Sequence, residues 1–224
     1  MNEEEAFLRA ICAEPDEDTP RLAFADWLDE HDRPERAEFI RVQCERARRS
    51  GHRERRTELL KRSMQLIQQF GRTWFTQDWP DAGENAVTGY TFDRGFVDCV
   101  SMSRRELQDA DIARIVRERP LLALVHTWNL SQNQIGDDGL QTIANCPRLS
   151  RLRHLGLTAN PVTLRGIEAL AASPHLMELK ELAMGHWFDP NNPDVLLGFM
   201  EAQAASREAH DIFQRYGKTV RILA

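Results

Sequence analysis

A run of arginines in the first quarter of the chain carries the side chains best suited to binding a polyanion. It comprises Arg46, Arg48, Arg49, Arg53, Arg55 and Arg56. Clustered guanidinium groups can follow the phosphates of a nucleic acid. The run lacks interleaved aromatic residues, however, and Glu45, Glu54 and Glu58 lie among the arginines. We therefore favour a solvated helix hairpin, or a patch neutralised by acidic helices, and keep a polyanion-binding patch as the alternative.

Two groups of acidic residues have side chains suited to binding a metal ion or transferring a proton. The first comprises Glu14, Asp16, Glu17 and Asp18, and the second comprises Asp26, Asp29, Glu30 and Asp32, with His31 among them. The first group lacks the glycine and the terminal glutamate of an EF-hand loop. Both groups lie next to predicted helix ends, so we interpret them as helix caps and solvated surface.

Histidine and cysteine residues show no spacing typical of a metal site or a catalytic pair. The seven histidines are scattered, and the four cysteines, at positions 12, 44, 99 and 146, include no CxxC pair. Such a pattern is typical of reduced thiols that fill the core of a cytosolic protein. The glycine-rich nucleotide loops and the GxSxG motif of hydrolases are absent from the sequence. We therefore expect no metal, no cofactor and no enzymatic activity.

Charge is unevenly distributed in the N-terminal part of the chain. The whole chain of 224 residues carries a net charge of −6, with 42% hydrophobic and 29% charged residues, as in ordinary soluble proteins. Residues 1–32 contain eleven acids against two arginines, and residues 33–62 contain eleven bases against five acids. These two blocks can face each other across a pair of helices. No signal peptide or membrane-spanning stretch is visible, so we expect a cytoplasmic protein that does not contact membranes.

The clearest pattern is a repeat with a period of about 27 residues, which extends from Leu124 to Met184. Residues 124–133, LVHTWNLSQN, align with residues 151–160, RLRHLGLTAN. The spacing L-x-x-L-x-L-x-x-N with a period of about 20–29 residues is typical of leucine-rich repeats. The sequence resembles the ribonuclease-inhibitor-like class of these repeats. This resemblance implies that each unit contains a short strand and a full helix.

The repeat predicts an α/β fold with a parallel sheet and helices along one side of it. Strand leucines should face the core, and Asn133 and Asn160 should bond to the backbone of the neighbouring repeat. The intervening residues would face outwards on the concave side, which is the usual binding face of the class: Thr127, Asn129 and Ser131; His154, Gly156 and Thr158; Glu181, Ala183 and Gly185. Because these residues are small and polar, we favour a face that is solvated or partly covered by residues 185–193 over a tight binding site.

Hydrophobic spacing near 3.6 residues predicts helices over residues 3–13, 20–30, from Pro34 onwards and over 54–70. The segments DTPRLAFADWLDEH, residues 18–31, and PERAEFIRVQ, residues 34–43, resemble the bacterial repeat-companion domain. The resemblance covers about residues 4–45 and implies an accessory helical module beside a repeat array, with no known reaction. Within it we expect a buried salt bridge from Asp26 to Arg21 or Arg41.

These patterns divide the chain into three parts. Residues 1–70 are a helical repeat-companion module, residues 71–95 an aromatic connector, and residues 96–224 a short leucine-rich-repeat solenoid. A strand and a helix before Pro120 form a degenerate first repeat, as terminal repeats are atypical. A helix over residues 194–216 and a strand over Val220–Leu223 close the far end.

The sequence favours a non-catalytic protein-interaction or scaffold module whose partner is another protein. The candidate binding residues are Thr127, Asn129, Ser131, His154, Thr158 and Glu181. The alternative is a nucleic-acid-associated regulator that uses the Arg46–Arg56 run. An unrecognised enzyme is a third hypothesis, which a pocket with titratable residues from both modules would support.

Overall fold

The computed structural model describes residues 2–48, 53–79, 88–103, 106–185 and 195–223 of the 224. The chain forms two compact units. The first, called the helical unit, comprises Met1–Gly83 and Tyr90–Asp98, and the second, called the sheet unit, comprises Glu84–Gly89 and Cys99–Ala224. Two strands, Gly89–Asp93 and Phe96–Ser101, span the boundary between them, so the chain passes from one unit to the other in extended conformation.

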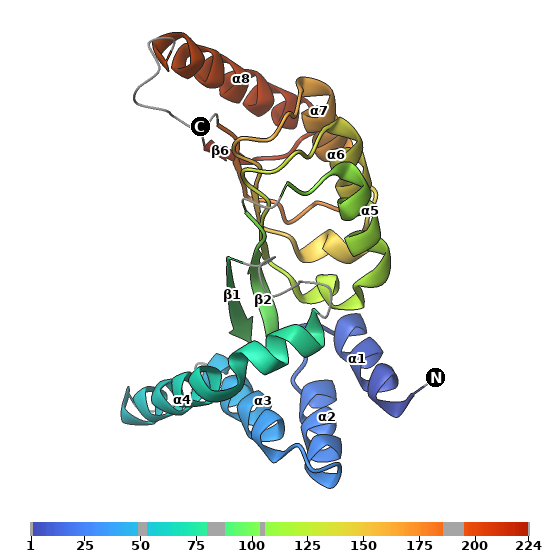
Figure 1. Ribbon diagram of the computed structural model, residues 1–224, viewed down its shortest axis with the longest axis vertical. Helices are drawn as coiled ribbons and strands as arrows, with labels where there is room; N and C mark the ends of the chain where they lie inside the picture. The colour runs from blue at the N-terminus through green and yellow to red at the C-terminus, as the bar shows by residue number, and fades with distance from the viewer. Residues whose placement is uncertain (1, 49–52, 80–87, 104–105, 186–194, 224) are drawn as a thin grey trace. The chain divides into compact units, whose positions relative to one another are not determined.

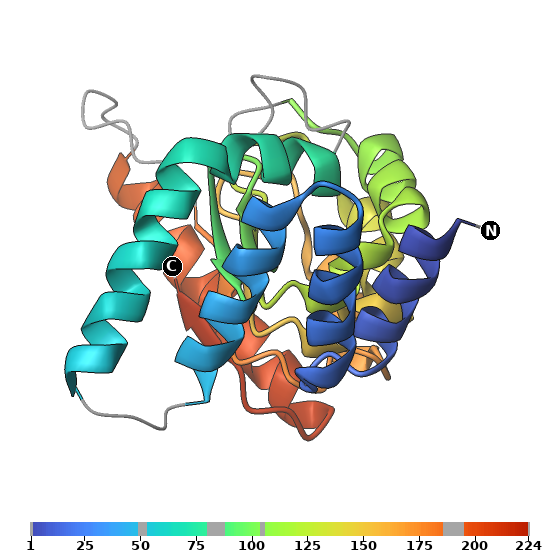
Figure 2. The same cartoon turned by 90° about the horizontal axis from the view of Figure 1, so that it is seen from below.

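Within the described residues the helical unit contains four helices: α1 (Glu3–Ala13), α2 (Thr19–Glu30), α3 (Pro34–Ala47) and α4 (Arg53–Asp78). Figure 2 shows α1, α2 and α3 side by side, and each contacts the next along the chain. The Asn2 side chain caps α1 by accepting a hydrogen bond from the Glu4 amide at 3.3 Å. Prolines occupy the first turns of α2 and α3, where a missing amide hydrogen costs nothing. The predicted helix starts are confirmed.

Helix α4 extends beyond residue 70, where the sequence predicted its end. Its buried residues include Leu66, Gly71, Trp74 and Phe75, which continue the face begun earlier in the helix. One glycine costs a helix about 1 kcal/mol. Burial of a single large apolar side chain recovers about 1.5–3 kcal/mol, so the helix continues through the glycine. Part of the predicted aromatic connector is thus helical, and residues 80–87 of it lie outside the described residues.

Strands β1 (Gly89–Asp93) and β2 (Phe96–Ser101) are neighbours joined by a two-residue turn that the sequence did not predict. Both turn residues, Arg94 and Gly95, have positive φ angles of 49° and 89°. The Gly95 amide donates to Gln43 Oε1 at 2.8 Å. A Cβ at this position would lie 2.5 Å from Ile40 Cγ1, so only glycine allows this approach of the turn to α3.

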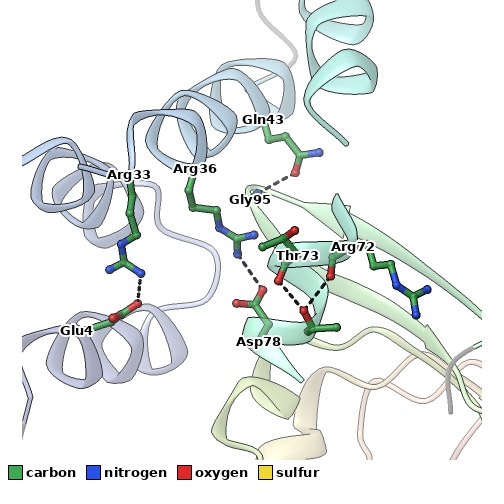
Figure 3. A network of polar contacts seen from close by, with 9 residues as sticks. Glu4, Arg33, Arg36, Gln43, Arg72, Thr73, Asp78 and Gly95 are labelled. Atoms are coloured by element: carbon green, nitrogen blue, oxygen red, sulfur yellow. Dashed lines mark hydrogen bonds and ion pairs between the residues drawn. The ribbon is translucent and has the colours of Figure 1, made fainter. Parts of the chain in front are cut away.

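The core of the helical unit is aromatic and encloses an ion pair. Phe39 stacks on Trp74 with ring centroids 4.7 Å apart. Beside them the Arg36 guanidinium donates to Asp78 Oδ2 at 2.8 Å (Figure 3). The guanidinium carbon lies 5.2 Å from the ring centre of Trp74 and 5.3 Å from that of Phe96. Arg36 therefore combines a buried charge pair with cation–π contacts.

In the part of the sheet unit that the structure describes, the end of β2 is followed by four parallel strands: β3 (Thr127–Asn129), β4 (His154–Gly156), β5 (Glu181–Ala183) and β6 (Arg221–Leu223). Thr127 pairs with His154, and His154 pairs with Glu181, so both pairs keep the offset of the sequence repeat. The predicted α/β class, parallel sheet and repeat length are therefore confirmed. The outer pairs differ, because Cys99 pairs with Thr127 and Glu181 with Arg221.

Helices separate these strands along the chain: α5 (Asp109–Glu118), α6 (Asp137–Ala144), α7 (Leu164–Ala172) and α8 (Val195–Arg215). Figure 1 shows them following one another along one side of the sheet, and each contacts the next. Two 3-10 helices, η1 (Pro120–Leu124) and η2 (Pro147–Arg151), lead into β3 and β4. Gly217, with a φ of 70°, follows α8 and ends it as expected.

The inward-facing strand residues form a continuous buried row. Trp128, Leu155 and Leu182 are at most 1% exposed. The apolar faces of α6 and α7 belong to the same core, with Ile143 and Ile167 fully buried. Each such side chain contributes about 1.5–3 kcal/mol through burial. Since one repeat alone would leave these side chains in water, the stability of the unit comes from stacking.

Asn160 and Asn133 tie each repeat to its neighbour. Asn160 Nδ2 donates to Leu130 O at 2.8 Å and to Leu157 O at 3.0 Å, and its Oδ1 accepts from the Ile135 amide at 3.1 Å. Asn133 makes the equivalent bonds one repeat earlier, including one to Leu130 O at 2.7 Å. Leu130 O thus accepts from both asparagines. The predicted role of these residues is confirmed.

A second set of bonds joins the starts of the helices. Asp137 Oδ1 accepts from the Thr163 amide at 2.8 Å, and Asp137 Oδ2 accepts from the Thr163 hydroxyl at 2.6 Å. A Cβ at Gly166 would lie 2.6 Å from Asp137 Oδ1, so this glycine leaves room for the carboxylate. Burial alone would raise the pKa of Asp137, but the Thr163 and Gly166 hydrogen bonds and the charge of Arg165 lower it overall.

The lowered pKa of Asp137 predicts a contribution to acid denaturation. The ionised carboxylate stabilises the fold above its ordinary pKa of 3.8, and this stabilisation is lost as the pH falls through the lower pKa of the folded protein. Asp137→Asn should therefore show a shallower loss of unfolding free energy than the native chain when both are acidified below pH 3.8. Urea denaturation at neutral and at acidic pH measures how the unfolding free energy of each chain changes with pH. An identical pH dependence of the two chains would contradict the prediction.

Candidate functional site

The outward face of β3, β4 and β5 carries the candidate binding residues in ordered columns. On each strand the middle residue is buried while its two neighbours are half-buried or exposed. Thr127, His154 and Glu181 occupy equivalent places in the register, and Arg221 of β6 follows them. Side chains that are distant in the sequence thus lie next to one another across the sheet.

One column is charged. His154 Nδ1 lies 3.4 Å from Glu181 Oε2, and Arg221 Nη1 lies 4.0 Å from the same oxygen. Glu181 is the least exposed of the three side chains, at 27%. The carboxylate therefore lies between two basic side chains, and this column offers both signs of charge to a partner. Arg221 is a member that sequence reasoning missed, because its offset from Glu181 is longer than the period of the repeat.

The next column is polar and internally bonded. Asn129 Nδ2 donates to Ser101 Oγ at 3.3 Å, and Asn129 Oδ1 accepts from the Ser131 amide at 3.0 Å. Across the sheet, a Cβ at Gly156 would lie 2.6 Å from Asn129 Oδ1, so the amide occupies the space that a larger residue would take. Hydrogen bonds thus fix the orientation of Asn129 before any partner arrives. Thr158, the remaining candidate, is half-buried, and its carbonyl accepts a bond from the Gln132 amide at 2.7 Å.

The arginine run of the helical unit is partly paired with acids. Arg48 donates to Asp18 at 2.9 Å, and Arg55 donates to both carboxylate oxygens of Glu45 at 2.7 and 2.8 Å. Arg46 is half-buried, Arg53 and Arg56 are exposed, and Arg49 lies outside the described residues. These contacts match the neutralised-patch interpretation, since Asp18 belongs to the acidic block that precedes the run.

The predicted partner of Asp26 is correct in identity but not in burial. Asp26 accepts from Arg41 at 2.6 Å, and its side chain is 73% exposed. It lies off the buried face of α2, which contains Arg21, Phe24 and Leu28. An exposed pair of this kind contributes about 0–1 kcal/mol. Of the two arginines predicted as partners, the buried one is Arg21, which donates to a backbone carbonyl in the preceding turn at 2.8 Å.

Further observations concern metal binding, thiol reactivity and membrane spanning. In this part of the chain no three histidine, cysteine or acidic side chains are grouped to hold a metal ion. Burial raises the pKa of the Cys44 thiol to about 12, which keeps it protonated and unreactive. No helix within the described ranges has both the length and the apolar character needed to cross a membrane.

Comparison with known proteins identifies one repeat. Residues 123–144 match a family model described as leucine-rich repeat. The matched segment contains β3 and α6, which form one strand-and-helix period of the sheet unit. A search of curated proteins finds no match to the chain.

Proposed function

From the leucine-rich repeat in the sheet unit, we propose that the protein is a non-catalytic protein-interaction module of the bacterial cytoplasm, with a scaffold role. In this proposal the sheet unit is a short solenoid of ribonuclease-inhibitor-like repeats, and the helical unit is its repeat-companion module. The outward face of β3 to β6 binds the protein partner. The main support is the common strand register, which presents equivalent side chains in columns at fixed spacing.

The chemistry of this face favours a polar partner surface. The charged column presents Glu181 between His154 and Arg221. Within the described strands the outward positions hold no tyrosine or tryptophan, which are the residues that usually dominate tight interfaces. Such a face suits a moderate-affinity contact whose specificity comes from charge complementarity.

Affinity capture of partners tests the proposal. The full chain and a His154→Ala/Glu181→Ala variant would capture proteins from a bacterial lysate for quantitative mass spectrometry. The matched control removes an exposed ion pair on the helices of the same unit, Asp138→Ala/Arg165→Ala, whose atoms are 3.7 Å apart. We expect proteins captured by the native chain to decrease at least about tenfold with the first variant, equivalent to about 1.4 kcal/mol, and to remain with the second. Equal capture by both variants would overturn the proposed face.

A further inference from the structure

A hollow beside the last strand of the sheet has the chemistry of a peptide-binding site. It lies between β6 and the second half of α8 and has a volume of about 780 Å³. The residues that surround it include Lys180, Ser206, Arg207, His210, Arg221 and Ile222. It adjoins the edge of the sheet at Ile222.

The backbone amide and carbonyl of one β6 residue, Ile222, are directed towards the free edge of the sheet. Arg221 N donates to Lys180 O at 2.8 Å, and Leu223 O accepts from the Met184 amide at 2.6 Å, so both residues turn their backbone groups towards β5. In a parallel strand, alternate residues bond to opposite neighbours. Ile222, which lies between them and lines the hollow, therefore directs its amide and carbonyl away from β5. Among the described strands none follows β6 to receive them.

The side chain of Ile222 gives independent evidence of an incomplete sheet. It continues the inward row of Leu155 and Leu182, which are 1% and 0% exposed. Ile222 itself is only half-buried, and its neighbour Leu223 is 39% exposed. One more strand beside β6 would cover this apolar position in the way that each repeat covers the one before it.

The charge around the hollow indicates what such a strand would carry. Lys180, Arg207 and Arg221 contribute positive charge, and Asp211 is the one acid among the described residues that line the hollow. This excess of positive charge favours a ligand with carboxylate groups.

We propose that the β6 edge binds an acidic peptide in extended conformation. The backbone of the peptide bonds to the amide and carbonyl of Ile222, and its acidic side chains lie against Lys180, Arg207 and Arg221. This site uses the backbone edge of β6 and shares only Arg221 with the columns of the outward face. Lys180 and Arg207 lie outside those columns, so substitution of these two residues tests the site separately from the proposed function.

The test begins with selection of random peptides on the full chain, each long enough to exceed an ordinary strand. We expect enrichment of aspartate and glutamate together with strand-forming residues. The affinity of a selected peptide is then measured by fluorescence anisotropy with two N-methylated versions, one blocking alternate amides and the other blocking the remaining amides. Since only one set of amides faces a neighbouring strand, one version should lose at least about tenfold in affinity and the other should bind normally.

Variants of the protein locate the site. Ile222→Pro removes the one amide hydrogen that faces the edge, and Lys180→Glu/Arg207→Glu reverses the charge of the hollow. Each should weaken binding at least about tenfold. Ile222→Val and Arg165→Glu, the latter at an 81% exposed site on α7, are the matched controls and should bind within about twofold of the native chain. Hydrogen exchange of the Arg221 amide checks that β6 stays paired in each variant.

Three outcomes would overturn the proposal. The first is selection of peptides without acidic enrichment. The second is equal binding, or equal loss of binding, by the two N-methylated peptides, since that excludes pairing with a strand edge. The third is displacement of the peptide by an oligonucleotide together with normal binding by Ile222→Pro, which would identify the hollow as a general polyanion site.

Discussion

Asp78→Ala is expected to lower the unfolding free energy of the helical unit by about 3–5 kcal/mol. Asp78 and Arg36 are 12% and 7% exposed, so the substitution leaves the guanidinium buried without its counter-charge. Arg36 Nη1 has no hydrogen-bond partner within the described residues. The cation–π contacts with Trp74 and Phe96, worth about 2 kcal/mol or more when desolvated, are already made in the native chain, so they do not replace the lost pair. Urea denaturation of the full chain, followed by tryptophan fluorescence, measures the loss.

Two controls separate burial from charge. Glu38→Ala removes the partner of Arg62 at an exposed site, where the atoms are 2.6 Å apart, and should cost less than about 1 kcal/mol. Arg36→Met/Asp78→Leu replaces both charges with apolar side chains and should be more stable than Asp78→Ala. A cost for Asp78→Ala that is no larger than that of Glu38→Ala would contradict the prediction.

Asn160→Leu is expected to cost about 2–6 kcal/mol, because two buried backbone groups lose their partners at about 1–3 kcal/mol each. These groups are Leu157 O and the Ile135 amide. Leu130 O keeps a bond from Asn133 at 2.7 Å, so it contributes nothing to the loss in the single variant. Denaturation of the full chain in urea measures the cost, and Gln134→Leu, at an exposed amide side chain next to Ile135, is the control.

The shared acceptor makes the two asparagines non-additive. In Asn133→Leu/Asn160→Leu both donors to Leu130 O are removed. The double variant should therefore lose about 1–3 kcal/mol more than the sum of the single variants. A double-mutant cycle measures this difference directly. Strict additivity would mean that one asparagine alone satisfies Leu130 O.

Sequence periodicity predicted those parts of the fold that repeat. The constant offset between repeats predicted the pairing of Thr127 with His154 and of His154 with Glu181, because stacked repeats must keep one register. It also predicted the bonds of Asn133 and Asn160. It could not predict the place of Arg221 in the charged column, since the chain between β5 and β6 has a different length.

Contacts between residues outside the repeats could not be predicted from the sequence. Arg36 and Asp78 are 42 residues apart, and no local pattern marks them as partners. The turn at Gly95 and the continuation of α4 through Gly71 depend on packing against other elements, which overrides local preference. The hollow beside β6 likewise depends on where α8 lies, whereas the sequence indicated only that a helix and a strand end the array.

Because β3, β4 and β5 follow one another at the same offset, the gene can gain a repeat without disturbing the sheet. Residues 134–160 span one whole period, from one asparagine turn to the next. Tandem duplication of this segment would add one strand and one helix, lengthen the sheet by about 4.8 Å and add one row to the outward face. Every new junction would reproduce an existing one. Insertion of a partial period would instead turn core residues outwards, so recombination can alter this protein only in whole repeats.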